Sequence, residues 1–474
     1  MPRIDQRTRP WWTLAGACFG LFILMLDSTV VALAISSIRD DVGADSAQLQ
    51  WVMNGYLLTI AVLVVTAGRI GDMFGRKRVF VVGMALFAAG SVLSGASQDP
   101  QMLIGGRVLQ GVGAAPILPL SLAIVCNAFP KAEQPRALGI WAGVSAVALA
   151  VGPLVGGSLI EIDWRLIFWI NLPIIALGVA LVLVAAPEST DPGAGTRIDL
   201  PGLIALTIGL GAVVLAMIQV EAWSDGAVVA LGAVGALALL AFWGIERRVR
   251  EPIVEFELFR NGPYFGASAV AFCLVAAYWT AMFFQPQYLQ DVRGYSALES
   301  GLLILPVTAP MVFISPFCGQ MVAAVGSRVL MTAGMAFATA GLVLLTQLEP
   351  GTSYGFLLVA YLLFGISLGL VYAPMSTAAM AAMPREKVGI ASGVLAMDRI
   401  VSGAVGLAAT GALFHVLRGG GDGFTAAIAS STWILAALAA LGVVFAWAFV
   451  RDPSDGPRNR HAASSVGHHR VTHF

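Results

Sequence analysis

The chain has 474 residues, of which 58% are hydrophobic and only 11% are charged, and its formal net charge is zero. Soluble domains carry about 25% charged residues, so this composition excludes a soluble protein and predicts an integral membrane protein with several spans. The balanced charge gives no indication of a nucleic-acid partner.

Fourteen apolar segments are each near the roughly 20 residues that a helix needs to cross a bilayer. Their predicted limits are 12–35, 50–70, 78–97, 102–127, 136–160, 166–186, 200–220, 226–245, 264–289, 300–323, 328–347, 354–380, 388–415 and 425–450. The first segment is too long for the core of a signal peptide and lacks a clear cleavage site, so we interpret it as an uncleaved span. The expected fold is therefore an all-α membrane protein with 14 transmembrane helices.

The distribution of basic residues predicts the orientation. If both termini are cytoplasmic, 21 of the 27 Lys and Arg residues lie on the internal side. Four lie outside, namely Arg39, Arg165, Arg293 and Arg418, and two lie within spans. Internal loops of membrane proteins carry an excess of basic residues. We therefore expect a multi-pass protein of the cell (inner or plasma) membrane with both termini in the cytoplasm.

The segments group into two halves around an insertion. We predict an N-terminal six-helix half at 1–187, linkers with an inserted two-helix hairpin at 188–263, a C-terminal six-helix half at 264–452 and a cytoplasmic tail at 453–474. A faint internal repeat supports this division. Gly68 and Gly75 recur seven apart as Gly319 and Gly326, about 250 residues later, as expected for two related halves.

One short turn, between the second and third segments, concentrates glycine and basic residues. It contains Gly68, Asp72, Gly75, Arg76, Lys77 and Arg78. The glycines allow a sharp bend and close backbone approach, and the cations should hold the turn in the cytoplasm. Asp72 is placed to meet a neighbouring helix N-terminus or a cation. The turn is either an ordinary basic loop or a conformational switch.

Ionisable side chains inside spans are costly and mark functional candidates. The spans contain four that we assign to proton coupling: Asp27, Arg107, Asp398 and Arg399. Asp27 and Arg107 lie roughly 12 and 8 Å from the outer ends of their helices, so they can share a polar cavity or pair directly. The alternative is a static pair that fixes helix packing. Adjacent helical residues point in different directions, so we do not expect Asp398 and Arg399 to pair.

The fifth segment carries Gly152, Pro153, Gly156 and Gly157. Proline removes a helical hydrogen bond and bends the helix, while glycines at four-residue spacing permit close packing. This pattern predicts a bend that is either a simple packing kink or part of the transport machinery.

Aromatic residues in the second half are candidates for a substrate cavity. They are Tyr278, Trp279, Phe283, Phe284, Tyr288, Tyr361 and Tyr372. From these we assign Trp279, Phe283, Tyr361 and Tyr372, together with Asp27 and Gln110, to the cavity wall. The alternative is that these rings lie in the core or at the membrane interface. The four cysteines show no metal or disulfide spacing, so we expect no metal site.

Several motifs resemble the major facilitator superfamily, and within it the fourteen-span drug:proton antiporters of the multidrug efflux type. The basic turn resembles the superfamily's signature loop, with Met73 where the family often has a basic residue. Residues 107–115 resemble its fourth-span motif, and 152–157 resemble the Gly-Pro pattern of exporters. Residues 26–31, 50–56, 163–165 and 168–173 are similar to the fourteen-span branch. The resemblance covers nearly the whole chain and is densest before residue 175.

This resemblance implies two six-helix halves that export a small amphipathic or drug-like compound in exchange for protons by alternating access. In the family the fourth-span arginine, here Arg107, is associated with proton transfer. We expect no enzyme activity, no cofactor other than the proton as coupling ion, and a monomer in the lipid bilayer. A proton-coupled importer of a small metabolite, or a non-transporting sensor on the same fold, remains an alternative.

Overall fold

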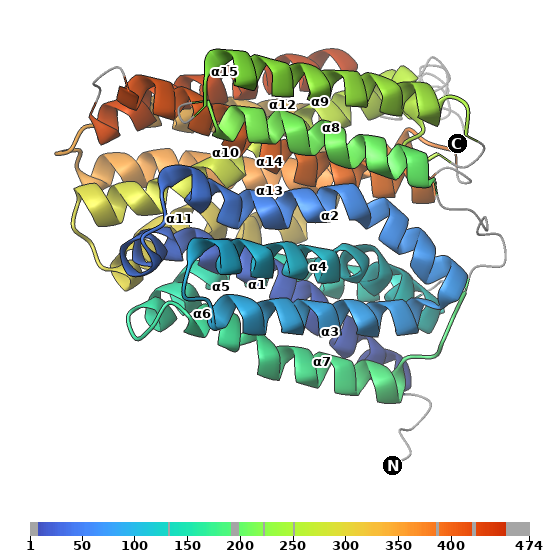
Figure 1. Cartoon of the computed structure of the whole chain (residues 1–474). Helices are drawn as coiled ribbons and strands as arrows, with labels where there is room; N and C mark the ends of the chain where they lie inside the picture. The colour runs from blue at the N-terminus through green and yellow to red at the C-terminus, as the bar shows by residue number, and fades with distance from the viewer. Residues whose placement is uncertain are drawn as a thin grey trace, which may run out of the picture.

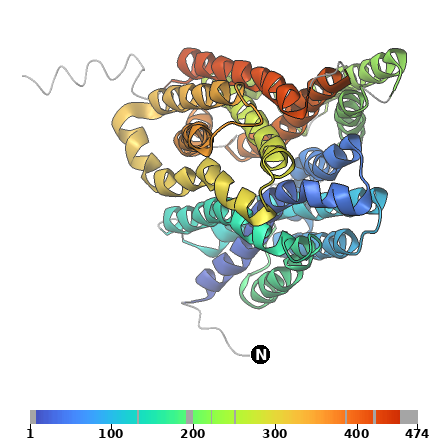
Figure 2. The ribbon, with the colours of Figure 1, turned by 90° about the vertical axis from the view of Figure 1, so that its left-hand side faces the viewer.

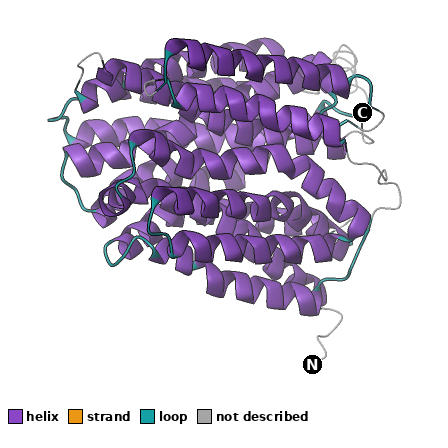
Figure 3. Cartoon of the chain, in the orientation of Figure 1, coloured by secondary structure: helices purple, strands orange, loops and turns teal. Residues whose placement is uncertain are grey.

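The computed structural model describes residues 8–130, 133–190, 199–220, 223–249, 252–384, 388–419 and 423–451. Within these ranges the chain forms helices and connecting turns and no strand (Figure 3). The predicted tail 453–474, most of the linker before residue 199, and the basic residues Lys131, Arg250, Arg385 and Lys387 lie outside the described residues.

Fourteen helices of the described chain are long and apolar enough to cross a membrane, which confirms the predicted span count. The first half contains α1 (Arg9–Val42), α2 (Ser46–Phe74), α3 (Arg76–Gly95), α4 (Pro100–Ala128), α5 (Gln134–Ile160), α6 (Leu166–Trp169) and α7 (Asn171–Ala185). The inserted hairpin is α8 (Leu200–Ile218) and α9 (Asp225–Glu246). The second half contains α10 (Gly262–Gln287), α11 (Ala297–Ile314), α12 (Cys318–Leu345), α13 (Tyr354–Ala381), α14 (Val388–Gly419) and α15 (Phe424–Phe449). The short α6 and α7 form one span.

Local sequence explains where several helices begin. Asp45 and Gln48 form a reciprocal capping box at the start of α2, and Ser296 and Glu299 do the same for α11. Each box satisfies backbone donors that have no partner within the helix. These caps fix the turns that lead into α2 and α11.

The helices form two bundles with the hairpin beside them (Figure 1). Figure 2 looks along the bundle and shows the blue and teal helices α1–α7 on one side and the yellow to red helices α10–α15 on the other. The hairpin lies at the edge between them, where α8 packs against α2 and α14. Large apolar side chains such as Val229 on α9 and Phe313 on α11 are exposed, at 69% and 72%, as expected of a surface that faces lipid.

The repeat between the halves is visible in the backbone. Gly75 ends α2 with φ of 113°, and Gly326 interrupts α12 with φ of 83°. Both values lie in the region that favours glycine. The segment before Gly326 starts at Ala297, three residues before the predicted limit of 300, and passes through a tight 3-10 turn at Ser315–Phe317. The helix after Gly326 ends at Leu345, two residues before the predicted limit of 347.

The two ends of the bundle differ in how the halves meet. We call the end that holds Arg9, Arg76, Lys77 and Arg78 the basic end, and the end that holds the last turn of α1, at Val42, the opposite end. Four hydrogen-bonded contacts between described residues of the two halves lie toward the opposite end. Arg39 pairs with Asp291 at 2.7 Å, Gln290 donates to the Leu33 carbonyl at 3.0 Å, Gln50 and His415 are 2.9 Å apart, and the Leu298 amide donates to Glu161 at 3.3 Å. The structure is therefore closed at the opposite end.

Reversing the charge of Arg39 is expected to weaken this closure. The Arg39 and Asp291 side chains are 35% and 21% exposed, and such pairs contribute about 0.2–1 kcal/mol. Arg39→Asp should therefore shift the population toward separation of the halves by up to about fivefold. The measurement is the distance between spin labels on the exposed residues Ile162 and Gly351. The double exchange Arg39→Asp with Asp291→Arg should restore the wild-type distances, and its failure to do so would show that the ion pair is not responsible.

Candidate functional site

A polar cluster lies inside the first half, with Asp27 at its centre. The Arg107 Nη1 atom donates to Asp27 Oδ2 at 2.5 Å. Gln110 Nε2 and Asn171 Nδ2 donate to Asp27 Oδ1 at 3.1 and 3.2 Å. Ser91 Oγ accepts from the same two amides at 2.9 and 3.1 Å. Helices α4 and α7 thus bond directly to the Asp27 carboxylate of α1, and Ser91 of α3 bonds to two of the amides that hold it.

The cluster is fully shielded from solvent. The Asp27 and Arg107 side chains are both 0% exposed. Arg107 also donates to the Val52 carbonyl and to Gln110 Oε1, at 3.0 and 2.7 Å, and its guanidinium carbon lies 4.2 Å from the centre of the Tyr56 ring. A buried ion pair is stable only when such hydrogen bonds offset the loss of hydration. Asp27 and Arg107 make most of the hydrogen bonds open to them, although Arg107 Nη2 has no protein partner.

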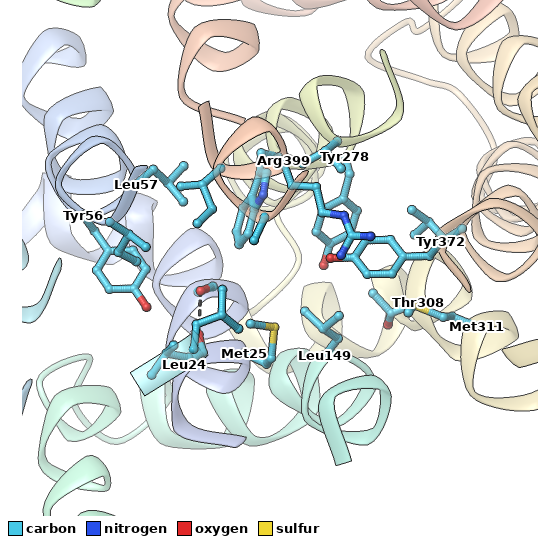
Figure 4. Close-up of a pocket in the computed structure, with 18 residues that line it drawn as sticks. Leu24, Met25, Tyr56, Leu57, Leu149, Tyr278, Thr308, Met311, Tyr372 and Arg399 are labelled. Carbon is cyan, nitrogen blue, oxygen red and sulfur yellow. Dashed lines mark hydrogen bonds between the residues drawn. The ribbon is translucent and has the colours of Figure 1, made fainter. Parts of the chain in front are cut away.

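A cavity of about 120 Å³ lies between the halves, next to this cluster. Its wall is built from α1, α2, α4 and α5 on one side and α10, α11, α13 and α14 on the other. Figure 4 shows the aromatic and basic residues Tyr56, Tyr278, Tyr372 and Arg399 around it. Asp27 does not line this cavity, but its neighbour Ser28 and the Tyr56 ring do. Tyr56 therefore separates the cavity from the ion pair and contacts both.

Asp398 and Arg399 point in different directions, as their adjacent positions on α14 imply. Arg399 lines the cavity, donates to Ser376 Oγ and stacks its guanidinium 4.7 Å from the centre of the Tyr372 ring. Asp398 does not line the cavity and forms no ion pair with Arg399 among the described residues; its Oδ2 atom is buried without a hydrogen-bond partner. Only one of the two charges faces the space between the halves.

Two of the predicted cavity residues, Trp279 and Tyr372, line the cavity, together with Tyr278. The other predicted members, Asp27, Gln110, Phe283 and Tyr361, do not line it in this structure. Asp27 and Gln110 are held inside the polar cluster by their hydrogen bonds to each other.

Phe283 and Tyr361 lie nearer the opposite end, where the halves are closed. Phe283 is one turn beyond Trp279 on α10 and borders a separate pocket with His415. Tyr361 is 1% exposed and donates its hydroxyl to Gln285 Oε1 at 2.8 Å. The depth of Phe283 and Tyr361 along their helices, which a composition pattern does not encode, explains why they do not line the cavity.

Three members of the site were not identified from the sequence: Tyr56 as a cavity residue, Asn171 as a partner of the carboxylate, and Ser91 as a partner of the Gln110 and Asn171 amides. Their polar side chains inside apolar segments were the available signal. Small polar residues are common in membrane helices, where they bond across helix interfaces. A polar side chain in an apolar segment therefore does not distinguish the residues near Asp27 from the other polar residues of the membrane helices.

Asp72 meets a cation of the basic turn, which is one of the two partners predicted for it. Asp72 pairs within the turn with Arg76 at 2.7 Å. The helix N-terminus nearby is capped instead by Glu188, which accepts from the amides of Lys77 and Arg78 at 3.0 and 3.2 Å. Lys77 in turn donates its ammonium to the Leu183 and Ala186 carbonyls at the end of α7. The turn therefore ties α3 to α7 within the first half.

Removing the Glu188 cap is expected to lower stability. A carboxylate at a helix N-terminus contributes about 0.5–2 kcal/mol, so Glu188→Ala should lower the thermal unfolding temperature of the purified protein. The matched control is Glu257→Ala, because that side chain is exposed and caps no helix. Equal unfolding temperatures for the two variants would contradict the capping role.

The glycines of α5 lie where the helix meets its neighbours most closely. A Cβ atom at Gly152 or Gly156 would meet Thr29 or Val30 of α1. At Gly157 it would lie 2.7 Å from the Leu298 Cα atom of α11, in the other half. The predicted Gly-Pro segment therefore packs α5 between α1 and α11, at the closed end of the structure.

Comparison with known proteins agrees with this architecture. The family model described as Major Facilitator Superfamily matches residues 17–407. Multidrug resistance protein Stp of Mycobacterium tuberculosis is 34% identical over 405 residues, which cover 85% of this chain and 75% of that protein. Puromycin resistance protein pur8 of Streptomyces alboniger is 33% identical over 479 residues, covering 96% and 94%. The solved structure of the xylose transporter XylE from E. coli, in a partially occluded inward-open conformation, has a TM-score of 0.66 at 14% identity and covers 95% of this chain and 99% of that one. At that identity the likeness concerns the fold alone.

Proposed function

Because this chain belongs to the Major Facilitator Superfamily, we propose that it exports a small amphipathic or drug-like compound in exchange for protons by alternating access. It is a multi-pass membrane transporter of the kind whose relatives are named for multidrug and antibiotic resistance. We further propose that the proton is the coupling ion and that transport is outward. The transporter is then a monomer with no nucleic-acid partner, no cofactor and no catalytic activity.

The observation that carries the proposal is the buried Asp27–Arg107 pair directly behind the cavity wall. When Asp27 is charged, Arg107 holds it, and the amides of Gln110 and Asn171 complete its hydrogen bonds. A proton on Asp27 removes the attraction to Arg107. Since Asp27 joins α1 directly to α4 and α7, protonation changes how these helices pack and biases the equilibrium between conformations.

The position of the cavity supports coupling of this step to substrate. Tyr56 faces the cavity and also contacts the Arg107 guanidinium. A substrate that displaces the Tyr56 ring also disturbs the ion pair. Substrate and proton therefore compete through one shared residue, as exchange requires.

We assign the basic end to the cytoplasm, because basic residues are concentrated on the internal side of membrane proteins. The closed opposite end is then the outer side, and the structure corresponds to the inward-facing state. Outward opening requires the contacts from Arg39, Gln50 and Gln290 to the second half to break. In that state Asp72 and the basic turn would bridge the cytoplasmic helix ends.

The test is gradient-driven uptake into everted membrane vesicles, using a panel of amphipathic dyes of both charges. An acid-inside gradient should drive dye accumulation, and a protonophore should abolish it. Vesicles without the protein provide the control. Gradient-dependent accumulation only in right-side-out vesicles would identify an importer, and no gradient-dependent flux in either orientation would favour a sensor.

A further inference from the structure

The central cavity carries one formal charge. Among the described residues that line it, Arg399 alone is ionisable at neutral pH, and the rest are apolar, aromatic or hydroxyl-bearing. This cation projects from α14 of the second half, across the cavity from Leu24 and Met25 of α1 (Figure 4). Its role is separate from that of the buried ion pair in the first half.

Arg399 forms no ion pair with any described residue. Its guanidinium donates to the neutral Ser376 hydroxyl, and its Nε atom is buried without a hydrogen-bond partner. Arg107, by contrast, is paired with Asp27 and bonded to Val52 and Gln110. An arginine left with unused donors beside a cavity is suited to bind an anion.

A second unused donor lies next to it. The Tyr278 hydroxyl, from α10, is buried and has no hydrogen-bond partner. Figure 4 shows Tyr278, Tyr372 and Arg399 together at one side of the cavity, with the Tyr372 ring under the guanidinium at 4.7 Å. Buried donors without partners are rare in folded proteins. The two unpartnered donors, Arg399 Nε and the Tyr278 hydroxyl, are explained if a ligand supplies the acceptor.

The remaining wall determines the rest of the ligand. Leu24, Met25, Leu57 and Leu149 of the first half form an apolar surface across from Arg399 (Figure 4). Apolar pockets with a few convergent polar groups bind ligands with a matching distribution of polarity. A compound that suits this cavity has a flat apolar body and an acidic group at one end.

We propose that the cavity binds amphipathic compounds with an acidic group, such as a carboxylate or an ionised phenol, through the Arg399 guanidinium and the Tyr278 hydroxyl. This ligand class is the substrate class of the transporter proposed above, and its physiological meaning rests on that proposed function. Binding itself does not require a proton gradient. Exchange of one such anion for one proton moves two positive charges inward per cycle, so a negative-inside membrane potential would drive export.

The test uses two dyes that share the xanthene ring system, fluorescein as the anion and rhodamine 123 as the cation. Fluorescence anisotropy measures their binding to the purified full chain in lipid nanodiscs, without a gradient. The wild type should bind fluorescein more tightly than rhodamine 123. Arg399→Gln should weaken fluorescein binding by about tenfold or more, because it removes a charge-assisted hydrogen bond. Tyr278→Phe should weaken it severalfold, and neither variant should weaken rhodamine 123 binding.

Arg399→Lys keeps the charge and should retain part of the fluorescein affinity, which separates loss of charge from loss of folding. Arg247→Gln is the matched control, because Arg247 is exposed at the end of α9, outside the cavity. Equal binding of the two dyes by the wild type, no binding of either, or an unchanged preference in Arg399→Gln would overturn the inference. Anion-selective binding without proton-driven transport would instead contradict the proposed function and leave the binding inference intact.

Discussion

Asp27→Asn is expected to reduce gradient-driven accumulation to the level of vesicles without the protein, while dye binding is retained. Asparagine has nearly the same shape as aspartate and keeps one of its two acceptor oxygens, but it cannot carry a proton between the two sides. Binding should persist because Asp27 does not line the cavity. The measurement compares proton-driven uptake with equilibrium binding in the same preparation.

The same substitution should destabilise the protein less than removal of Arg107. Either substitution leaves a buried, unpaired charge, which costs about 3–5 kcal/mol. Arg107→Ala also removes the hydrogen bonds to the Val52 carbonyl and to Gln110 and leaves the space of the guanidinium empty, whereas asparagine keeps the shape of aspartate. Asp40→Asn is the matched control, since it lies on the same helix with a side chain that is 72% exposed. Normal accumulation in Asp27→Asn would contradict the coupling role and direct attention to Asp398, whose Oδ2 atom is also buried.

Gly301→Ala is expected to prevent closure of the opposite end and to abolish transport. A Cβ atom at Gly301 of α11 would lie 2.2 Å from the Pro153 carbonyl oxygen of α5, far closer than atoms can pack. Because the clash involves backbone, no side chain can rotate away. Overpacking of this kind costs about 1–3 kcal/mol, which shifts the population about five- to 150-fold toward the state in which the halves are separated there.

Spin labels on Ile162 and Gly351 report this shift as a longer distance in Gly301→Ala. Gly355→Ala is the control, because a Cβ atom there, on α13, would meet nothing within 4 Å. Gly157→Ala should behave like Gly301→Ala, since its Cβ atom would meet Leu298 across the same interface. Wild-type distances together with normal transport in Gly301→Ala would show that the close packing of α5 and α11 is not required for the cycle.

Hydropathy and charge were sufficient to predict the framework. A helix in lipid must satisfy its own backbone hydrogen bonds, so each crossing leaves a long apolar segment in the sequence. All fourteen were found in this way, including the α8–α9 hairpin. The cost of a charge in lipid likewise made Asp27 and Arg107 stand out, and their similar predicted depths suggested the pair that the structure contains at 2.5 Å.

The sequence could not determine which way each side chain faces or what it meets. Membrane helices such as α7 and α9 are apolar on all sides, because lipid and the protein interior have similar polarity, so no periodicity identifies the face toward a cavity. The tertiary structure alone decided that Arg399 faces the cavity while Asp398 does not, and that Tyr361 bonds to Gln285 instead of lining it. It also decided that Glu188, more than a hundred residues away, caps the helix that starts at the basic turn. These outcomes depend on the rotation and depth of helices relative to partners distant in the chain, and only their packing together determines both.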